Sequence, residues 1–150
     1  MLILAPADPP DLTALLYQGD PSDPDVLRGK RILLLEDEVF IAVELRRGLE
    51  AAGAKVVYAR TLARAHRALD QGGLDGAVLD VTLSATETCE PIAGRLRAAG
   101  VPFLLHSGDL DRQGEVLANL EAPVVAKPAA AEVVANRLGA LLREPQTPPH

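Results

Sequence analysis

The feature that most constrains this chain is a regular alternation of short apolar runs with helix-like segments, which starts near Lys30. Each apolar run is nearly continuous, as is typical of a parallel strand that is buried on both faces. Parallel neighbours need a crossover connection, which is usually a helix. The alternation therefore predicts an α/β fold, with a five-stranded parallel sheet and helices on both of its faces. The predicted strands are Arg31–Leu35, Lys55–Ala59, Gly76–Asp80, Phe103–His106 and Val124–Ala126.

The segments between the strands show helical periodicity of varying strength. The first carries a continuous apolar stripe and stops at Gly53, a residue suited to a helix end. The fourth is weak, because Gly114 and Asn119 interrupt a small apolar face. The predicted helices are Val39–Ala52, Leu62–Gln71, Pro91–Ala99, Asp111–Leu120 and Ala130–Leu142.

The two ends of the chain differ from this pattern. Residues 1–29 hold five prolines and five aspartates, which predicts a flexible leader. Within the leader, Asp11 could cap a short helix over residues 11–17, and a nascent helix that never docks is an equally good interpretation. We expect one folded domain over residues 30–143 and a disordered tail over 144–150, without a second domain.

The composition excludes several classes of protein. A net charge of −6 argues against nucleic acid or an anionic membrane as the main partner. The single cysteine cannot form an intrachain disulfide. No apolar run approaches the roughly 20 residues of a membrane span, and the N-terminus lacks the pattern of a signal peptide. We therefore expect a cytoplasmic protein.

Polar residues follow the predicted strands at one edge of the sheet. Glu36 and Asp37 end the first strand, Asp80 ends the third, Ser107 the fourth and Lys127 the fifth. Open parallel sheets bind ligands at the carboxyl ends of their strands. Three carboxylates that converge there cannot all stay ionised without a cation, and sites made only of oxygen ligands suit Mg²⁺. The sequence thus predicts a magnesium site.

These residue types together suit phosphoryl transfer. Asp80 could attack phosphorus as a nucleophile, and the Ser107 hydroxyl and the Lys127 ammonium could hold phosphoryl oxygens. Each feature alone has a simpler interpretation: an acidic pair after a strand is usually a solvated loop or a cap, and a lysine before proline says little. The signal is that all five residues fall at strand ends in a consistent order.

The histidines and the cysteine point to no second site. His106 precedes Ser107 in a strand, so its side chain should face the other way and pack beneath a helix. We expect His66 on a helix surface, His150 on the tail, and no zinc site. Cys89 is interpreted as an inert thiol.

Four segments, LLLEDE, AVLDVTL, LLHSGD and VVAKPA, resemble the signature segments of response-regulator receiver domains, the CheY-like family. The resemblance covers about residues 30–143 and implies a flavodoxin-like, doubly wound sheet with strand order 2-1-3-4-5. It also implies a role for each matching residue. These are the phospho-acceptor Asp80, the metal ligands Glu36, Asp37, Asp80 and the Thr82 backbone carbonyl, the phosphoryl-binding and switch residues Ser107 and Lys127, and a cis bond before Pro128.

The chain departs from the family pattern at three places. Ser84 and Thr88 stand where receivers usually have proline and glycine, and Val124 replaces the usual aromatic switch residue. The stretch VPFLLHSGD partly resembles the PFxFATG signature of the FAT GUY receivers, which are often single-domain and also lack the aromatic. Here Leu105–Ser107 replace Phe-Ala-Thr.

The resemblance implies a stand-alone receiver in a two-component system. A sensor histidine kinase or a histidine phosphotransfer protein would supply the phosphoryl group to Asp80, with Mg²⁺ as cofactor. We expect output by protein–protein contact or phosphate shuttling, because no DNA-binding segment follows Leu142; a homodimer is left open. Such a protein is not an enzyme, although it assists its own phosphoryl transfer and dephosphorylation.

Two other functions stay open on the sequence alone. A degenerate receiver could act as a binding module that needs no phosphorylation, as the altered loop after Asp80 allows. A Mg²⁺-dependent phosphohydrolase with an aspartate nucleophile is the other, although Asp80-Val81-Thr82 lacks the second acid of the haloacid-dehalogenase pattern.

Overall fold

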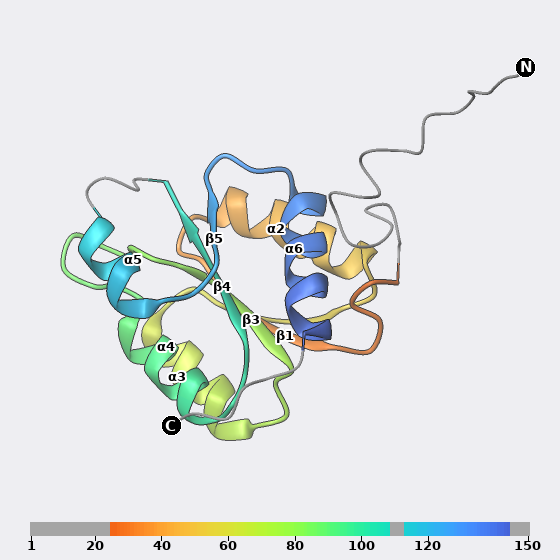
Figure 1. The fold of residues 1–150 in the computed structure, drawn as a ribbon, viewed down its shortest axis with the longest axis horizontal. Helices are drawn as coiled ribbons and strands as arrows, with labels where there is room; N and C mark the ends of the chain where they lie inside the picture. The colour runs from red at the N-terminus through yellow and green to blue at the C-terminus, as the bar shows by residue number, and fades with distance from the viewer. Residues whose placement is uncertain (1–24, 109–112, 145–150) are drawn as a thin grey trace, which may run out of the picture.

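The computed structural model describes residues 25–108 and 113–144, and these form alternating strands and helices (Figure 1). The predicted helix at 11–17 and most of the predicted tail lie outside the described residues. The elements in chain order are β1 Arg31–Leu35, α2 Val39–Ala51, β2 Lys55–Ala59, α3 Leu62–Gln71, β3 Gly76–Asp80, α4 Glu90–Ala98, β4 Phe103–Ser107, α5 Gly114–Leu120, β5 Val124–Ala126 and α6 Ala131–Arg143.

The five strands form one parallel sheet in the order β2-β1-β3-β4-β5, which confirms the predicted fold. The central strands β1 and β3 pair from Ile32–Gly76 to Leu35–Leu79. Strand bounds agree with the sequence except that β4 extends to Ser107. The carboxyl ends of all five strands therefore lie along one edge.

Helices cover both faces of the sheet. In Figure 1, α2 and α6 lie together on one face and α3, α4 and α5 lie on the other. Because side chains alternate along a strand, Ile32 and Leu34 pack under α2 and α6, whereas Leu33 and Leu35 face the opposite core. Every residue of β3 and β4 is buried, which explains their continuous apolar sequences.

The helices begin and end close to the predicted positions. Thr61 caps α3 by accepting a hydrogen bond from the Arg64 backbone at 3.2 Å. Helix α5 is seven residues long, Gly114–Leu120, and the start predicted at Asp111 lies outside the described residues. Only Leu120 of α5 is buried, so this helix has the small apolar face that the sequence indicates.

Residues 25–29, which the sequence assigns to the leader, pack on the folded domain. Leu27 is fully buried, and its backbone N–H donates to the Ala52 carbonyl at 2.8 Å. Gly53 has φ +100°, and a Cβ at this position would lie 2.7 Å from the Arg28 backbone. A short turn with one large apolar side chain thus completes the core under α2 and α6.

Replacing Leu27 by alanine is expected to lower the free energy of unfolding by about 2–5 kcal/mol, because it removes a fully buried side chain. Urea denaturation measures the loss. Arg28→Ala is the control, because the Arg28 side chain is 77% exposed and should matter by less than about 0.5 kcal/mol. Equal, small effects of both changes would show that residues 25–29 do not stabilise the folded domain.

Within the described ranges, no helix has the length and apolar character needed to cross a membrane.

Candidate functional site

The polar residues predicted at the strand ends continue the row of side chains that faces α2 and α6. Glu36, Asp80, His106 and Lys127 follow Leu34, Val78, Leu104 and Val125 at alternating positions, one strand after another. Asp80 stands opposite His106 in the register of β3 and β4. Glu36 is fully buried, and Asp80 and His106 are 4% and 3% exposed. The apolar row beneath therefore ends in a buried layer of ionisable groups.

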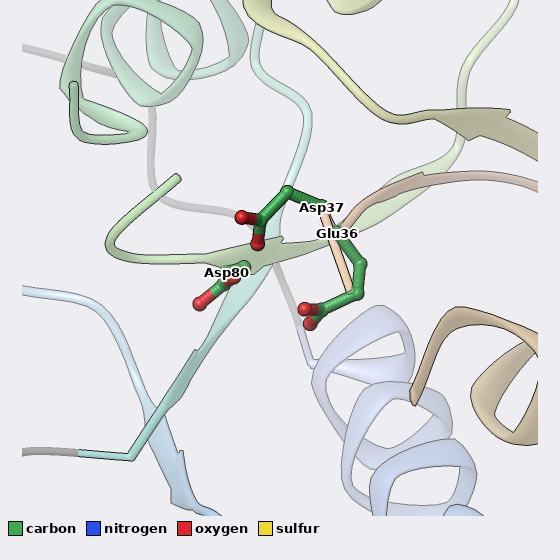
Figure 2. Close-up of side chains that lie close together, drawn as sticks. All are labelled: Glu36, Asp37 and Asp80. Atoms are coloured by element: carbon green, nitrogen blue, oxygen red, sulfur yellow. The ribbon is translucent and has the colours of Figure 1, made fainter. Parts of the chain in front are cut away.

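Three carboxyl groups meet in this layer. Ligand oxygens of Glu36, Asp37 and Asp80 lie within 4.8 Å of one another, and Figure 2 shows the three side chains turned towards a common space at the ends of β1 and β3. Burial, followed by the charge of Glu36, raises the pKa of Asp80 to about 8. Burial likewise raises the pKa of Glu36. The site thus disfavours the ionised form of both carboxyl groups.

Lys127 is the cation of this site. Its Nζ lies 3.2 Å from Asp80 Oδ1 and 3.3 Å from Glu36 Oε2. Burial works against its charge, but Asp80 and Glu36 outweigh that effect and the pKa of Lys127 is raised. The peptide bond from Lys127 to Pro128 is cis. One ammonium faces three carboxyl groups, so full ionisation leaves two negative charges without compensation.

The donor set fits a hard divalent cation such as Mg²⁺. All three nearby side chains offer oxygen, and Glu36 Oε2 is a buried oxygen without a hydrogen-bond partner. Asp37, Asp80, Thr82 and Lys127 line a cavity of about 570 Å³ that gives access from solvent. Among the described residues no histidine or cysteine joins a cluster of this kind.

Ser107 is connected to the cavity by Gln113, a residue that the sequence did not single out. Ser107 is fully buried, and its hydroxyl donates to the side-chain oxygen of Gln113. The Gln113 amide in turn donates to the Thr82 hydroxyl, and both residues line the cavity. Gln113 directly precedes α5. No sequence signal marks it, because a single glutamine in a weakly helical segment is uninformative.

His106 lies closer to the acids than its strand position suggested. It is buried on the α2 and α6 face, as expected, but its Nδ1 is 4.0 Å from Glu36 Oε2. His66 lies on α3, and its ring contacts Arg95 on the surface, as predicted. His150 lies outside the described residues. Burial raises the pKa of the Cys89 thiol to about 12, which favours the protonated thiol.

Comparison with known proteins relates the chain to a curated protein and to solved structures. No family model matches the chain. The swarming motility regulation protein RssB of Serratia marcescens is 31% identical over 116 residues, which are 75% of this chain and 52% of RssB, so the chain spans about half the length of this curated relative.

Two solved structures resemble the whole folded part. SdrG from Sphingomonas melonis Fr1 is 34% identical with a TM-score of 0.64, and the match covers 75% of this chain and 95% of SdrG. A response regulator receiver protein from Sinorhizobium medicae WSM419 has a TM-score of 0.67 at 22% identity, covering 75% of this chain and 94% of that protein. At 22% identity, the similarity to the Sinorhizobium medicae protein shows a shared fold.

Proposed function

Because the chain belongs to the response-regulator receiver family, we propose that it accepts a phosphoryl group on Asp80 and transmits a signal through that modification. The observation that carries the proposal is the position of Asp80. It is a nearly buried carboxylate at the end of the central strand β3, and it lines an open cavity beside Lys127.

Each neighbour of Asp80 has a part in the transfer. An Asp80 carboxylate oxygen forms a bond to phosphorus while the bond from phosphorus to a donor nitrogen breaks; that nitrogen keeps the electron pair and takes up a proton. Lys127 already contacts Asp80 and shifts its ammonium to the phosphoryl oxygens. Ser107 turns its hydroxyl from Gln113 towards the same group.

Glu36, Asp37 and Asp80, with the Thr82 carbonyl, are the groups that would hold Mg²⁺. When bound there, the ion supplies positive charge that favours ionised Asp80 and neutralises phosphoryl oxygens. The protein is a stoichiometric acceptor in this scheme and not a catalyst of turnover. A cytoplasmic location is part of the proposal, because the kinases that would supply the phosphoryl group use cytoplasmic ATP.

Intact mass after incubation with Mg²⁺ and a small phosphodonor such as acetyl phosphate tests the proposal. We expect one added phosphate, which is lost when EDTA replaces Mg²⁺. No adduct under any condition would favour a binding module that needs no phosphorylation. Continuous release of phosphate from many phosphate esters would favour a phosphohydrolase instead.

An apolar groove beside the site suits the phosphodonor protein. Phe40 is 90% exposed and Val39 and Val43 are each 45% exposed. These residues, with the start of α6, line a groove of about 720 Å³. The groove lies on the helices that directly follow Asp37 and Lys127. A helix of a histidine kinase or phosphotransfer protein seated there would bring its phosphohistidine to the mouth of the Asp80 cavity.

Phe40→Ser is expected to slow phosphoryl transfer from a phosphorylated histidine protein that labels the wild type by at least about 10-fold, since exposed aromatic residues dominate binding energy at such contacts. Labelling by acetyl phosphate should stay unchanged, because Phe40 does not line the Asp80 cavity. Val133→Ser is the matched control: Val133 is 37% exposed on α6 and does not line the groove. Equal slowing by both donors would show that the change acts on the site and not on docking.

A further inference from the structure

His106 and Glu36 share an unusual feature. Both are buried, and within residues 25–108 and 113–144 the buried side-chain atoms without a hydrogen-bond partner are Glu36 Oε2 and the two ring nitrogens of His106. Buried polar groups are normally paired, because an unpaired one loses its bonds to water without replacement. All such atoms thus fall in one place, with Nδ1 and Oε2 4.0 Å apart.

This separation is short enough for a hydrogen bond to form after a small movement. A bond from a ring N–H to oxygen measures about 2.7–3.2 Å, so the gap is about 1 Å too wide. A neutral imidazole carries one N–H donor, on Nδ1 or on Nε2. Placed on Nδ1, that hydrogen faces Glu36 Oε2, the carboxylate oxygen that accepts no hydrogen bond.

Glu36 depends at present on Lys127. Its Oε1 accepts from the Glu38 backbone at 3.3 Å, and Lys127 Nζ lies 3.3 Å from Oε2. The Glu36 backbone is fixed separately, because the Tyr58 hydroxyl donates to its carbonyl at 2.8 Å. Lys127 is shared with Asp80, so a phosphoryl group on Asp80 competes for the ammonium. Glu36 would then lose its cationic partner, while His106 remains.

We propose that His106 is a positioning residue for the acidic site: its Nδ1–H tautomer donates to Glu36 Oε2 and keeps this carboxylate turned towards Asp37 and Asp80 when Lys127 moves to the phosphoryl oxygens. This inference rests on the proposed function for the movement of Lys127. The contact between His106 and Glu36 itself affects how well Glu36 binds a divalent cation. Hydrogen-bond partners of metal ligands commonly change metal affinity by 10–100-fold when removed.

The first test reads the tautomer of the wild-type chain. Long-range ¹H–¹⁵N correlation of histidine-labelled protein at one fixed pH distinguishes Nδ1–H from Nε2–H at His106. We expect Nδ1–H, with a change in its nitrogen shift when Mg²⁺ is added. An Nε2–H tautomer overturns the proposal, and this measurement needs no variant to fold.

The second test measures Mg²⁺ affinity by calorimetry for two variants of the full chain. His106→Leu removes the donor and should weaken binding by about 10-fold. His106→Asn keeps an N–H near the Nδ1 position and should bind within about 3-fold of the wild type. Wild-type affinity in His106→Leu overturns the proposal.

Labelling of the wild type with acetyl phosphate, run in parallel, separates this inference from the proposed function. Phosphate uptake with an Nε2–H tautomer refutes only the role of His106. No uptake with an Nδ1–H tautomer and weakened Mg²⁺ binding in His106→Leu refutes the phospho-acceptor while the contact to Glu36 stands.

Discussion

Asp80→Asn is expected to abolish the gain of one phosphate from Mg²⁺ and acetyl phosphate. Asparagine keeps the size of the side chain but offers no carboxylate oxygen for attack on phosphorus. Because Asp80 is 4% exposed and contacts Lys127 at 3.2 Å, no neighbouring carboxyl group can replace its position without a rearrangement. The loss should therefore be complete within the sensitivity of intact-mass detection.

The control for this substitution is Asp70→Asn. Asp70 is an exposed carboxylate on α3 whose partner is Arg95, and it lies outside the cavity. This variant should take up phosphate as the wild type does. If Asp80→Asn still gained one phosphate, the acceptor would have to be another residue, and Asp37 would be the first to examine because it lines the same cavity.

Without divalent cations, the protein is expected to become less stable as the pH rises from 6.5 to 8. The folded pKa of Asp80 is about 8 against 3.8 for the free group, so between these values the folded state holds a proton that the unfolded state has released. The stability due to this proton is fully present below about pH 4 and is lost as the pH rises through about 8. At about 1.4 kcal/mol per pH unit, the loss from 6.5 to 8 is about 2 kcal/mol.

Below pH 6.5, His106 changes the stability with the opposite sign. Its pKa is lowered from 6.5 to about 4, so stability rises with pH between these values and offsets part of the Asp80 effect there. Lys127 acts elsewhere: its pKa is raised above 10.5, so its contribution is lost only at higher pH. Above pH 6.5 the decline due to Asp80, together with the raised pKa of Glu36, remains without this offset.

Urea unfolding in EDTA at pH 6.5 and pH 8 measures this effect. Saturating Mg²⁺ should remove most of the decline, because the ion binds the ionised carboxylates of the folded state. Asp80→Asn in EDTA should also lose most of it and should be more stable than the wild type at pH 8. A wild-type free energy of unfolding that is constant or rises over this window in EDTA would contradict the assignment of a raised pKa to Asp80.

The family resemblance drawn from the four motifs is confirmed by the relatives and by the strand order, whereas membership of the FAT GUY subgroup stays a prediction. The roles of Asp80, Ser107 and Lys127 also stay predictions. The structure places Asp80 beside Lys127 and the other acids, and it connects Ser107 to the cavity through Gln113.

The sequence by itself determined where the strands lie and which polar residues follow each of them. Strands such as Ile32–Leu35 are buried on both faces, so their apolar character appears directly in consecutive residues, and the carboxyl edge of a parallel sheet brings together whatever follows each strand. Glu36, Asp37, Asp80 and Lys127 could therefore be grouped without coordinates.

Only the tertiary structure decided the contacts between elements that are distant in sequence. Gly48 lets α2 approach α6 closely, since a Cβ there would lie 2.3 Å from the Ala131 Cβ, yet a glycine inside a helix has no such meaning in sequence. Leu27 likewise becomes part of the core only because α2 and α6 leave room for it. The proximity of His106 to Glu36 depends on the spacing of three adjacent strands and on the side-chain rotamers at their ends, and local sequence carries no information about either.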